Sequence, residues 1–159
     1  DLYKEAAALA PDSEEAAKGL EKASALYLAQ IRYEENLRSA EKYSEAGRFP
    51  LAKKFFNRAM DSRPSRVSSA LDKREKRLRE ELERQSEKVP LILESDNRTY
   101  VSMTGVFPPE RFREKQLRVY PDVYTVRGTR KDYADVEKEI KVNADTPGRT
   151  IAVEAGEKQ

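Results

Sequence analysis

The 159-residue chain contains no cysteine, no histidine and no tryptophan. Without cysteine it has neither a disulfide framework nor a thiolate nucleophile. The joint absence of cysteine and histidine removes most zinc sites and the usual catalytic triads and dyads. The redox compartment stays open, because a chain without cysteine tolerates oxidising and reducing conditions alike.

Long apolar runs are missing as well. None approaches 18 residues, so the sequence offers no membrane span, and no signal peptide is recognisable. The chain starts without Met, and the pattern Leu2-Tyr3-x-x-Ala6-x-x-x-x-Pro11 is typical of the last turns of a helix. We therefore expect the C-terminal fragment of a longer protein, with any anchor or targeting signal lying upstream.

Signatures of catalysis and ligand binding are also absent. The chain has no GxxxxGK[ST] and no GxGxxG loop for phosphates. Its carboxylates mostly accompany Lys or Arg on predicted helices, as in residues 80–84. Neither Asp96-Asn97 nor the turn at 145–148 supplies the alternating oxygen ligands of a Ca²⁺ site. We expect a protein that is not an enzyme, with no catalytic residue, cofactor, metal or small-molecule substrate.

Charge is abundant but nearly balanced. Charged residues make up 38% of the chain, and 31 basic against 29 acidic residues give a net charge of +2. The distribution is uneven, since residues 53–79 carry ten basic and three acidic residues. With a mean hydropathy of -0.88, this composition favours long solvated helices packed along a narrow stripe, plus a modest second core.

A continuous helical pattern extends over residues 13–46, which contain no proline and only one glycine. Asp12, with Glu15 three residues later, predicts a capping box at its start. Unbroken, this helix would be roughly 50 Å long at about 1.5 Å per residue. Apolar residues recur at the helical steps of three and four: Ala16, Leu20, Ala23, Tyr27, Ile31, Tyr33, Leu37, Ala40 and Tyr43.

A glycine corner and a second helix follow. Gly47 can take the positive φ that ends a helix, and Pro50 suits the first turn of the next one, predicted over residues 50–62. Pro64 ends that helix. A third helix is expected over residues 66–88.

The spacing after the corner is typical of two closely packed helices. Ala52 and Ala59 are small enough for close approach, and Phe56 fills the space between the helices. This pattern resembles the second half of a tetratricopeptide repeat (TPR), and the resemblance covers residues 2–64. The interval between Pro11 and Pro64 is 53 residues instead of 34, which we interpret as a lengthened first helix.

The third helix carries one thin apolar stripe amid dense mixed charge. One interpretation is a terminal helix that caps the hairpin. The other is a short coiled-coil seam that would allow a homo-oligomer through residues 66–88. The stripe consists of Val67, Leu71, Leu78 and Leu82.

From Val89-Pro90 onward the apolar period changes from 3.6 to 2, which predicts a boundary between a helical domain, 1–88, and a β domain, 89–159. Asp96-Asn97 predicts a hairpin turn joining the first two strands, and residues 105–113 are expected to form a loop. Regular turn spacing favours a small antiparallel β-sandwich. Strands are predicted over residues 91–93, 99–103, 115–120, 123–127, 136–142 and 150–154.

The β segment resembles the small sandwich modules of the PEGA-like family. The likeness rests on Pro121-x-x-Tyr124-Thr125-Val126, on Asp132-Tyr133, and on the closing strands. Where the family usually has glycine, this chain has Asp122 and Asp132, and the motif that names the family is absent. Helical repeats followed by such a module resemble bacterial envelope proteins tethered to the inner membrane, which implies a non-enzymatic scaffold or adaptor role.

The expected fold is therefore α+β: a TPR-like hairpin with a long first helix and a third capping helix, then the sandwich. The candidate partner-binding residues are Phe107, Arg111, Phe112 and Arg113, since two aromatics and two arginines on a proline-stiffened loop are typical of an interface anchor. The alternative is that Phe107 and Phe112 close one end of the β core. Tyr124 and Tyr133 are expected at the core or its edge.

The partner implied by the resemblance is another protein of an envelope assembly, with this chain facing the periplasm and anchored upstream; a cytoplasmic location is the alternative. The basic residues 53–79 leave two further interpretations open, namely binding to nucleic acid or anionic lipid and binding to an acidic protein. We do not expect nucleic acid as the main partner, because these charges spread around two helices. A purely structural self-association module is the last alternative.

Overall fold

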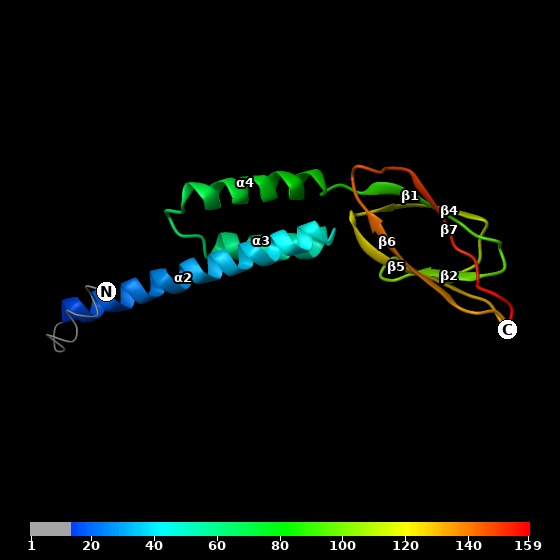
Figure 1. Ribbon diagram of the computed structural model, residues 1–159, viewed down its shortest axis with the longest axis horizontal. Coiled ribbons are helices and arrows are strands. Elements are labelled where there is room, and N and C mark those ends of the chain that lie inside the picture. Colours follow the sequence, from blue (N-terminus) through cyan, green and yellow to red (C-terminus); the bar gives the residue numbers. More distant parts are fainter. Residues whose placement is uncertain (1–13) are drawn as a thin grey trace.

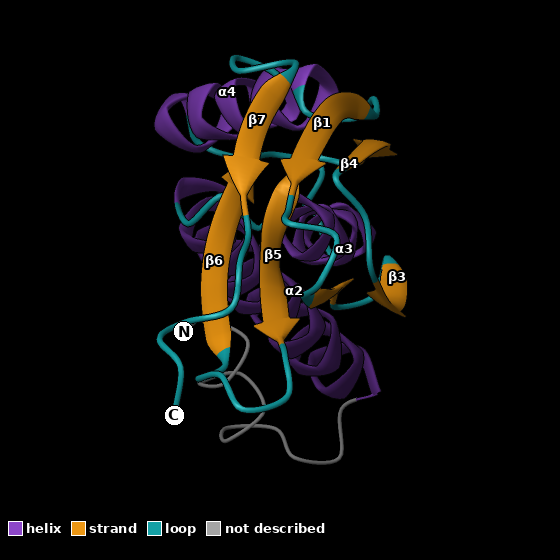
Figure 2. Ribbon diagram, turned by 90° about the vertical axis from the view of Figure 1, so that its right-hand side faces the viewer, coloured by secondary structure: helices purple, strands orange, loops and turns teal. Residues whose placement is uncertain are grey.

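The computed structural model describes residues 14–159 and confirms the α+β class. Within this range three helices come first and seven strands follow (Figure 1). The helices lie at one end of an elongated molecule and the strands at the other, so Figure 2 is a view from the strand end. The helix expected over residues 1–10 and the cap at Asp12 lie outside the described residues.

The long first helix is confirmed as one unbroken element, α2, which spans Glu14–Glu45. Its N-terminal half extends beyond α3 and α4 in Figure 1. The expected apolar stripe is therefore buried mainly where the other helices reach it. Three side chains of the C-terminal half are fully buried, namely Tyr33, Leu37 and Ala40, whereas three of the N-terminal half are exposed, namely Leu26, Tyr27 and Leu28.

The corner after α2 has the geometry predicted for Gly47. Its φ is +80°, its N–H donates to the carbonyl of Ser44 at 3.0 Å, and the N–H of Arg48 donates to the carbonyl of Tyr43 at 2.9 Å. These are the two hydrogen bonds of a Schellman helix ending. Helix α3 begins immediately afterwards and spans Phe49–Asp61, with a proline in its first turn.

Helix α4 spans Ser69–Arg84 and is shorter than predicted. It starts where the Ser68 side chain accepts the N–H of Leu71 at 3.2 Å, which is an ordinary N-cap. Its apolar stripe packs into the helical core, so this side of α4 contacts α2 and α3 of the same chain. The core comprises Tyr33, Leu37, Ala40, Phe49, Ala52, Phe56, Ala59, Leu71, Leu78 and Leu82.

One carboxylate is buried in this helical core. Glu75 of α4 is 3% exposed, and Arg63 donates to it through Nε at 2.6 Å. The Tyr33 hydroxyl donates to the same oxygen at 3.4 Å, while Arg79 lies 3.9 Å from the other oxygen. Burial, and then the negative charge of Glu75, raise the pKa of Tyr33. The ion pair of Arg63 and Glu75 joins the link after α3 to the centre of α4.

The strands form two sheets that share one hydrophobic core. The first has the order β4-β1-β7 and the second β3-β2-β5-β6. The core draws side chains from both sheets and includes Leu91, Leu93, Val101, Met103, Val126 and Ile140. The bounds are Val89–Glu94 for β1, Tyr100–Met103 for β2, Phe107–Glu110 for β3, Glu114–Val119 for β4, Asp122–Thr129 for β5, Val136–Val142 for β6 and Arg149–Ala152 for β7.

The prediction of a β-hairpin at Asp96-Asn97 is wrong. Strand β1 pairs with β4 and β7, and strand β2 pairs with β3 and β5, so the turn passes from one sheet to the other. Asn97 has a φ of +60°. The Asp96 carboxylate accepts the N–H groups of Arg98 and Thr99, both at 2.8 Å. The residues of a tight turn are therefore present, but they stabilise a crossover.

Two other strand predictions are corrected. Strands β1 and β7 are parallel, whereas every other pair of named strands is antiparallel. Residues 107–110, expected within a loop, form the edge strand β3. Its pairing with β2 is irregular, because Pro108 and Pro109 have no N–H to donate to a ladder.

Candidate functional site

The four predicted partner-binding residues lie in and just after β3. The rings of Phe107 and Phe112 make an edge-to-face contact with centroids 6.2 Å apart, and both are partly buried against the β core. Their packing matches the alternative in which they close one end of that core. Arg111 and Arg113 are exposed beside them, so the two cations of the set are the accessible ones.

Two cations of this region lie over aromatic rings. The Arg111 guanidinium is 5.3 Å from the centroid of Tyr100, whose side chain is 47% exposed. Lys115 lies 4.8 Å from the ring of Phe107 and pairs with Glu110 at 2.5 Å. We call Tyr100, Arg111 and Lys115 the cationic cluster of the β part. Sequence reasoning missed Tyr100, although its alternation with the buried Val101 predicts an outward direction.

Tyr124 and Tyr133 differ in their surroundings. Tyr124 packs against the β core, and its hydroxyl donates to the carbonyl of Tyr120 at 2.5 Å. Burial, and then the nearby charge of Asp122, raise the pKa of Tyr124 to about 12. Tyr133 is partly exposed, with the Arg130 guanidinium 4.1 Å from its ring centroid.

A groove runs between α3 and α4. Phe56 and Leu82 form its apolar floor, since both are mostly buried, and the Arg79 guanidinium lies 5.4 Å from the centroid of the Phe56 ring. The groove has a volume of about 350 Å³. We call it the α3–α4 groove; its lining residues are Lys53, Phe56, Asn57, Arg79, Leu82, Glu83 and Ser86.

A second hollow adjoins this groove on the side of the β part. It has a volume of about 290 Å³, and Lys53, Leu82 and Ser86 line both spaces. Tyr120 forms its outer wall, with 53% of the side chain exposed and Lys88 at 5.3 Å from the ring centroid. We call it the junction hollow; its lining residues are Phe49, Pro50, Lys53, Leu82, Gln85, Ser86, Tyr120 and Pro121.

The walls of the hollow are fixed by contacts between the helices and the sheets. Gln85 is 4% exposed; it accepts the backbone N–H of Ala144 at 2.8 Å and donates to Glu81 at 3.2 Å. Arg84 pairs with both Glu81 and Asp145. Since an unpaired buried amide costs about 1–3 kcal/mol, the bond between Ala144 and Gln85 favours one arrangement of the two parts.

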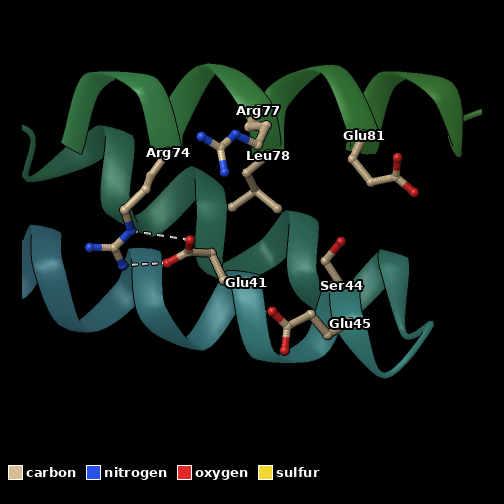
Figure 3. A pocket seen from close by; sticks show the side chains of 7 residues that line it. All are labelled: Glu41, Ser44, Glu45, Arg74, Arg77, Leu78 and Glu81. Carbon is tan, nitrogen blue, oxygen red and sulfur yellow. Dashed lines mark hydrogen bonds and ion pairs between the residues drawn. The ribbon is translucent and has the colours of Figure 1, made fainter. Parts of the chain in front are cut away.

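A third cleft, of about 330 Å³, lies between α2 and α4. Figure 3 shows carboxylates on both helices and guanidinium groups on α4, with two dashed lines joining Arg74 to Glu41. This hydrogen bond raises the pKa of Arg74. The cleft therefore presents mixed charge, with Leu78 as the apolar side chain among its lining residues.

The basic residues of segment 53–79 fall into two groups. Four form ion pairs with acidic side chains of the helical part, namely Arg63, Arg74, Lys76 and Arg79. Six are exposed and have no ion-pair partner among the described residues, namely Lys53, Lys54, Arg58, Arg66, Lys73 and Arg77. The second group is divided between α3, α4 and the link joining them, so it forms no single basic face.

Within residues 14–159, no group of three or more acidic side chains is placed to hold a metal ion. No helix in that same range has both the length and the apolar character needed to cross a membrane. No protein-family model matches the chain, and none of the curated proteins matches it.

Proposed function

We propose that the chain is a non-enzymatic protein-interaction scaffold, and that it works in an assembly of the bacterial cell envelope. The observation that carries the scaffold proposal is the composite surface at the junction. Side chains from α3, α4 and the segment before β5 line the junction hollow, and the hydrogen bond from the Ala144 N–H to Gln85 joins the end of α4 to the β part beside it. Such a surface provides shape and charge for a partner.

The envelope location and the family assignment rest on the resemblance to TPR and PEGA-like proteins. Local features that support the TPR-like interpretation are the positive φ of Gly47 and the burial of Ala52, Phe56 and Ala59. The paired sheets with a shared core are compatible with a PEGA-like module. The parallel pairing of β1 with β7 departs from the all-antiparallel sandwich that we expected.

The scaffold proposal can be tested by affinity capture with the full chain as bait. The source is a nuclease-treated extract of bacterial envelopes, and the readout is mass spectrometry. Two surface variants are compared with the natural chain: Tyr120→Ala in the junction hollow, and the double variant Tyr100→Ala with Arg111→Ala in the cationic cluster. Circular dichroism establishes that each variant is folded.

We expect at least one protein to be retained by the natural chain and lost in one folded surface variant. Tyr27→Ala is the matched control, because Tyr27 is 68% exposed on α2 and far from both surfaces along the chain. A set of retained proteins that no surface variant changes would contradict a specific interaction surface. Retention that is seen with a parallel untreated extract and absent from the nuclease-treated one would favour nucleic-acid binding instead.

A further inference from the structure

We propose that the α3–α4 groove and the junction hollow together bind an acidic amphipathic helix of a partner protein. This inference rests on the scaffold function proposed above and specifies the surface and the chemical class of the partner. The first observation is that the two spaces adjoin, because Lys53, Leu82 and Ser86 line both.

The floor of the two adjoining spaces is apolar, and their combined length along α3 matches a short helix. Phe49, Phe56 and Leu82 form the floor, and each keeps a small exposed fraction of 7–8%. Phe49 and Asn57 mark the two ends along α3, eight residues apart, or about 12 Å at 1.5 Å per residue. An amphipathic helix that anchors through positions i, i+3 or i+4, and i+7 needs about 10.5 Å.

The charges around the groove determine the sign of the partner. The lining residues include two cations, Lys53 on α3 and Arg79 on α4, and one acidic residue, Glu83, in the α3–α4 groove. Arg79 also lies 3.9 Å from Glu75, and Lys88 stands outside the lining, beside Tyr120. The Lys53 side chain is exposed and forms no ion pair among the described residues. An acidic polar face on the partner helix therefore gains favourable contacts, and a basic one is repelled.

Tyr120 provides the anchor at the β end. Exposed tyrosines supply a large apolar area with little conformational entropy and are enriched among residues that dominate interface energies. Its position next to Pro121 at the end of the hollow lets a bound helix contact both parts of the chain. A helix seated on α3 and α4 alone would lack this contact.

The test is direct binding of a defined peptide to the full chain, followed by fluorescence anisotropy. The probe is a fluorescein-labelled 14-residue peptide with Leu or Phe at every third or fourth position and Glu or Asp elsewhere. One matched peptide replaces the acids with Lys, and another replaces the apolar residues with Ser. We expect saturable binding of the acidic amphipathic peptide alone, weakened by added salt because the charges involved are exposed.

Variants of the chain locate the site. Lys53→Glu should weaken binding about three- to tenfold, the range expected when an exposed pair is exchanged for a repulsion. Lys73→Glu is the matched control, because Lys73 is equally exposed and unpaired on α4 but does not line the groove. Asn57→Trp should block the groove by bulk without changing its charge.

Several outcomes would overturn the inference. Equal binding of the acidic and basic peptides, or equal weakening by Lys53→Glu and Lys73→Glu, would show that the groove does not select the partner. Binding of a DNA duplex that is lost in Lys53→Glu, with no peptide binding, would assign the charges to nucleic acid. The groove could also fail while the scaffold function stands. This would be the result if a captured envelope protein still bound the Lys53→Glu and Asn57→Trp variants but no longer bound the double variant of Tyr100 and Arg111.

Discussion

Replacement of Arg63 by methionine should destabilise the helical part, because it leaves the buried carboxylate of Glu75 without its main partner. The Glu75 side chain is 4% exposed, and its closest cationic atom is Arg63 Nε at 2.6 Å. Breaking a buried ion pair from one side costs about 3–5 kcal/mol. The Arg63 side chain is 30% exposed and Arg79 remains 3.9 Å from Glu75, so we expect a smaller loss, of about 2–3 kcal/mol.

The assay is urea unfolding followed by circular dichroism at 222 nm, which reports mainly on the three described helices. In a separate thermal unfolding experiment, a loss of this size would appear as a decrease in melting temperature of roughly 5–10 °C for a chain of this length. Arg66→Met is the matched control, since Arg66 lies in the same link, is exposed, and has no ion pair among residues 14–159. It should change the free energy of unfolding by less than about 0.5 kcal/mol.

A second variant separates the orphaned charge from lost packing. In the double variant Arg63→Met with Glu75→Met no unpaired carboxylate remains, so it should be more stable than Arg63→Met alone. If Arg63→Met costs no more than Arg66→Met, or if the double variant is the less stable of the two, then the pair does not act as a buried ion pair and this reasoning is refuted.

Three further predictions concern the corner, the crossover turn and the β core. Gly47→Ala should cost about 1–2 kcal/mol in urea unfolding because of the positive φ, and Gly47→Asn should cost less; equal costs would contradict an origin in the backbone conformation, since a Cβ here would make only an ordinary contact, 3.7 Å from Val123. Burial alone would raise the pKa of Asp96, but the N–H groups of Arg98 and Thr99 and the Thr99 hydroxyl lower it overall. Its stabilising contribution is therefore present above about pH 4 and lost as pH falls through the lower folded pKa, so the stability difference from Asp96→Asn should shrink below about pH 4; a constant difference would contradict this. Tyr124 has a pKa raised to about 12, so its contribution is present below about pH 10 and lost between about pH 10 and 12. Tyr124→Phe should reduce the alkaline loss of stability in that window, and an unchanged loss would contradict this.

The helical part was predictable because its signals are local. A helix is specified by the spacing of apolar residues within a few positions. Gly47 marks the end of α2 and Pro50 the start of α3, each through its own backbone preference. The structure confirms these elements, with α3 displaced by one residue and α4 shortened at both ends. The shortening has a local cause at the start, where Ser68 caps the helix through Leu71.

The strand pairing was not predictable, because it depends on residues far apart in the sequence. Asp96 and Asn97 have the turn chemistry of a hairpin, and the same chemistry serves a crossover. What decides between them is the pairing of β1 with β4 and β7, and no short segment encodes it. Strand β3 was missed for a related reason, since two prolines favour a loop unless the segment lies at the edge of a sheet.

The candidate site shows the same division between local and distant information. Phe107, Arg111, Phe112 and Arg113 were found as a short cluster, but the structure buries part of both aromatic rings and brings Arg111 to Tyr100. The junction hollow joins Phe49, Leu82 and Tyr120, which are separated by more than thirty residues at each step. No window of the sequence contains it.

The wide separation of these three residues in the sequence means that recognition at the junction hollow depends on the folded arrangement of the chain. A partner that contacts Phe49, Leu82 and Tyr120 together is recognised only when the helices and sheets keep one relative arrangement. Gln85 meets that requirement, because its amide is buried and the bond that it accepts from the Ala144 N–H would be lost if the two parts separated or rotated. Gln85→Leu should therefore weaken binding at the hollow, while the cationic cluster around Tyr100 should keep its affinity for a partner of its own. Equal loss at both surfaces would mean that Gln85 supports the fold as a whole and not the geometry of the junction.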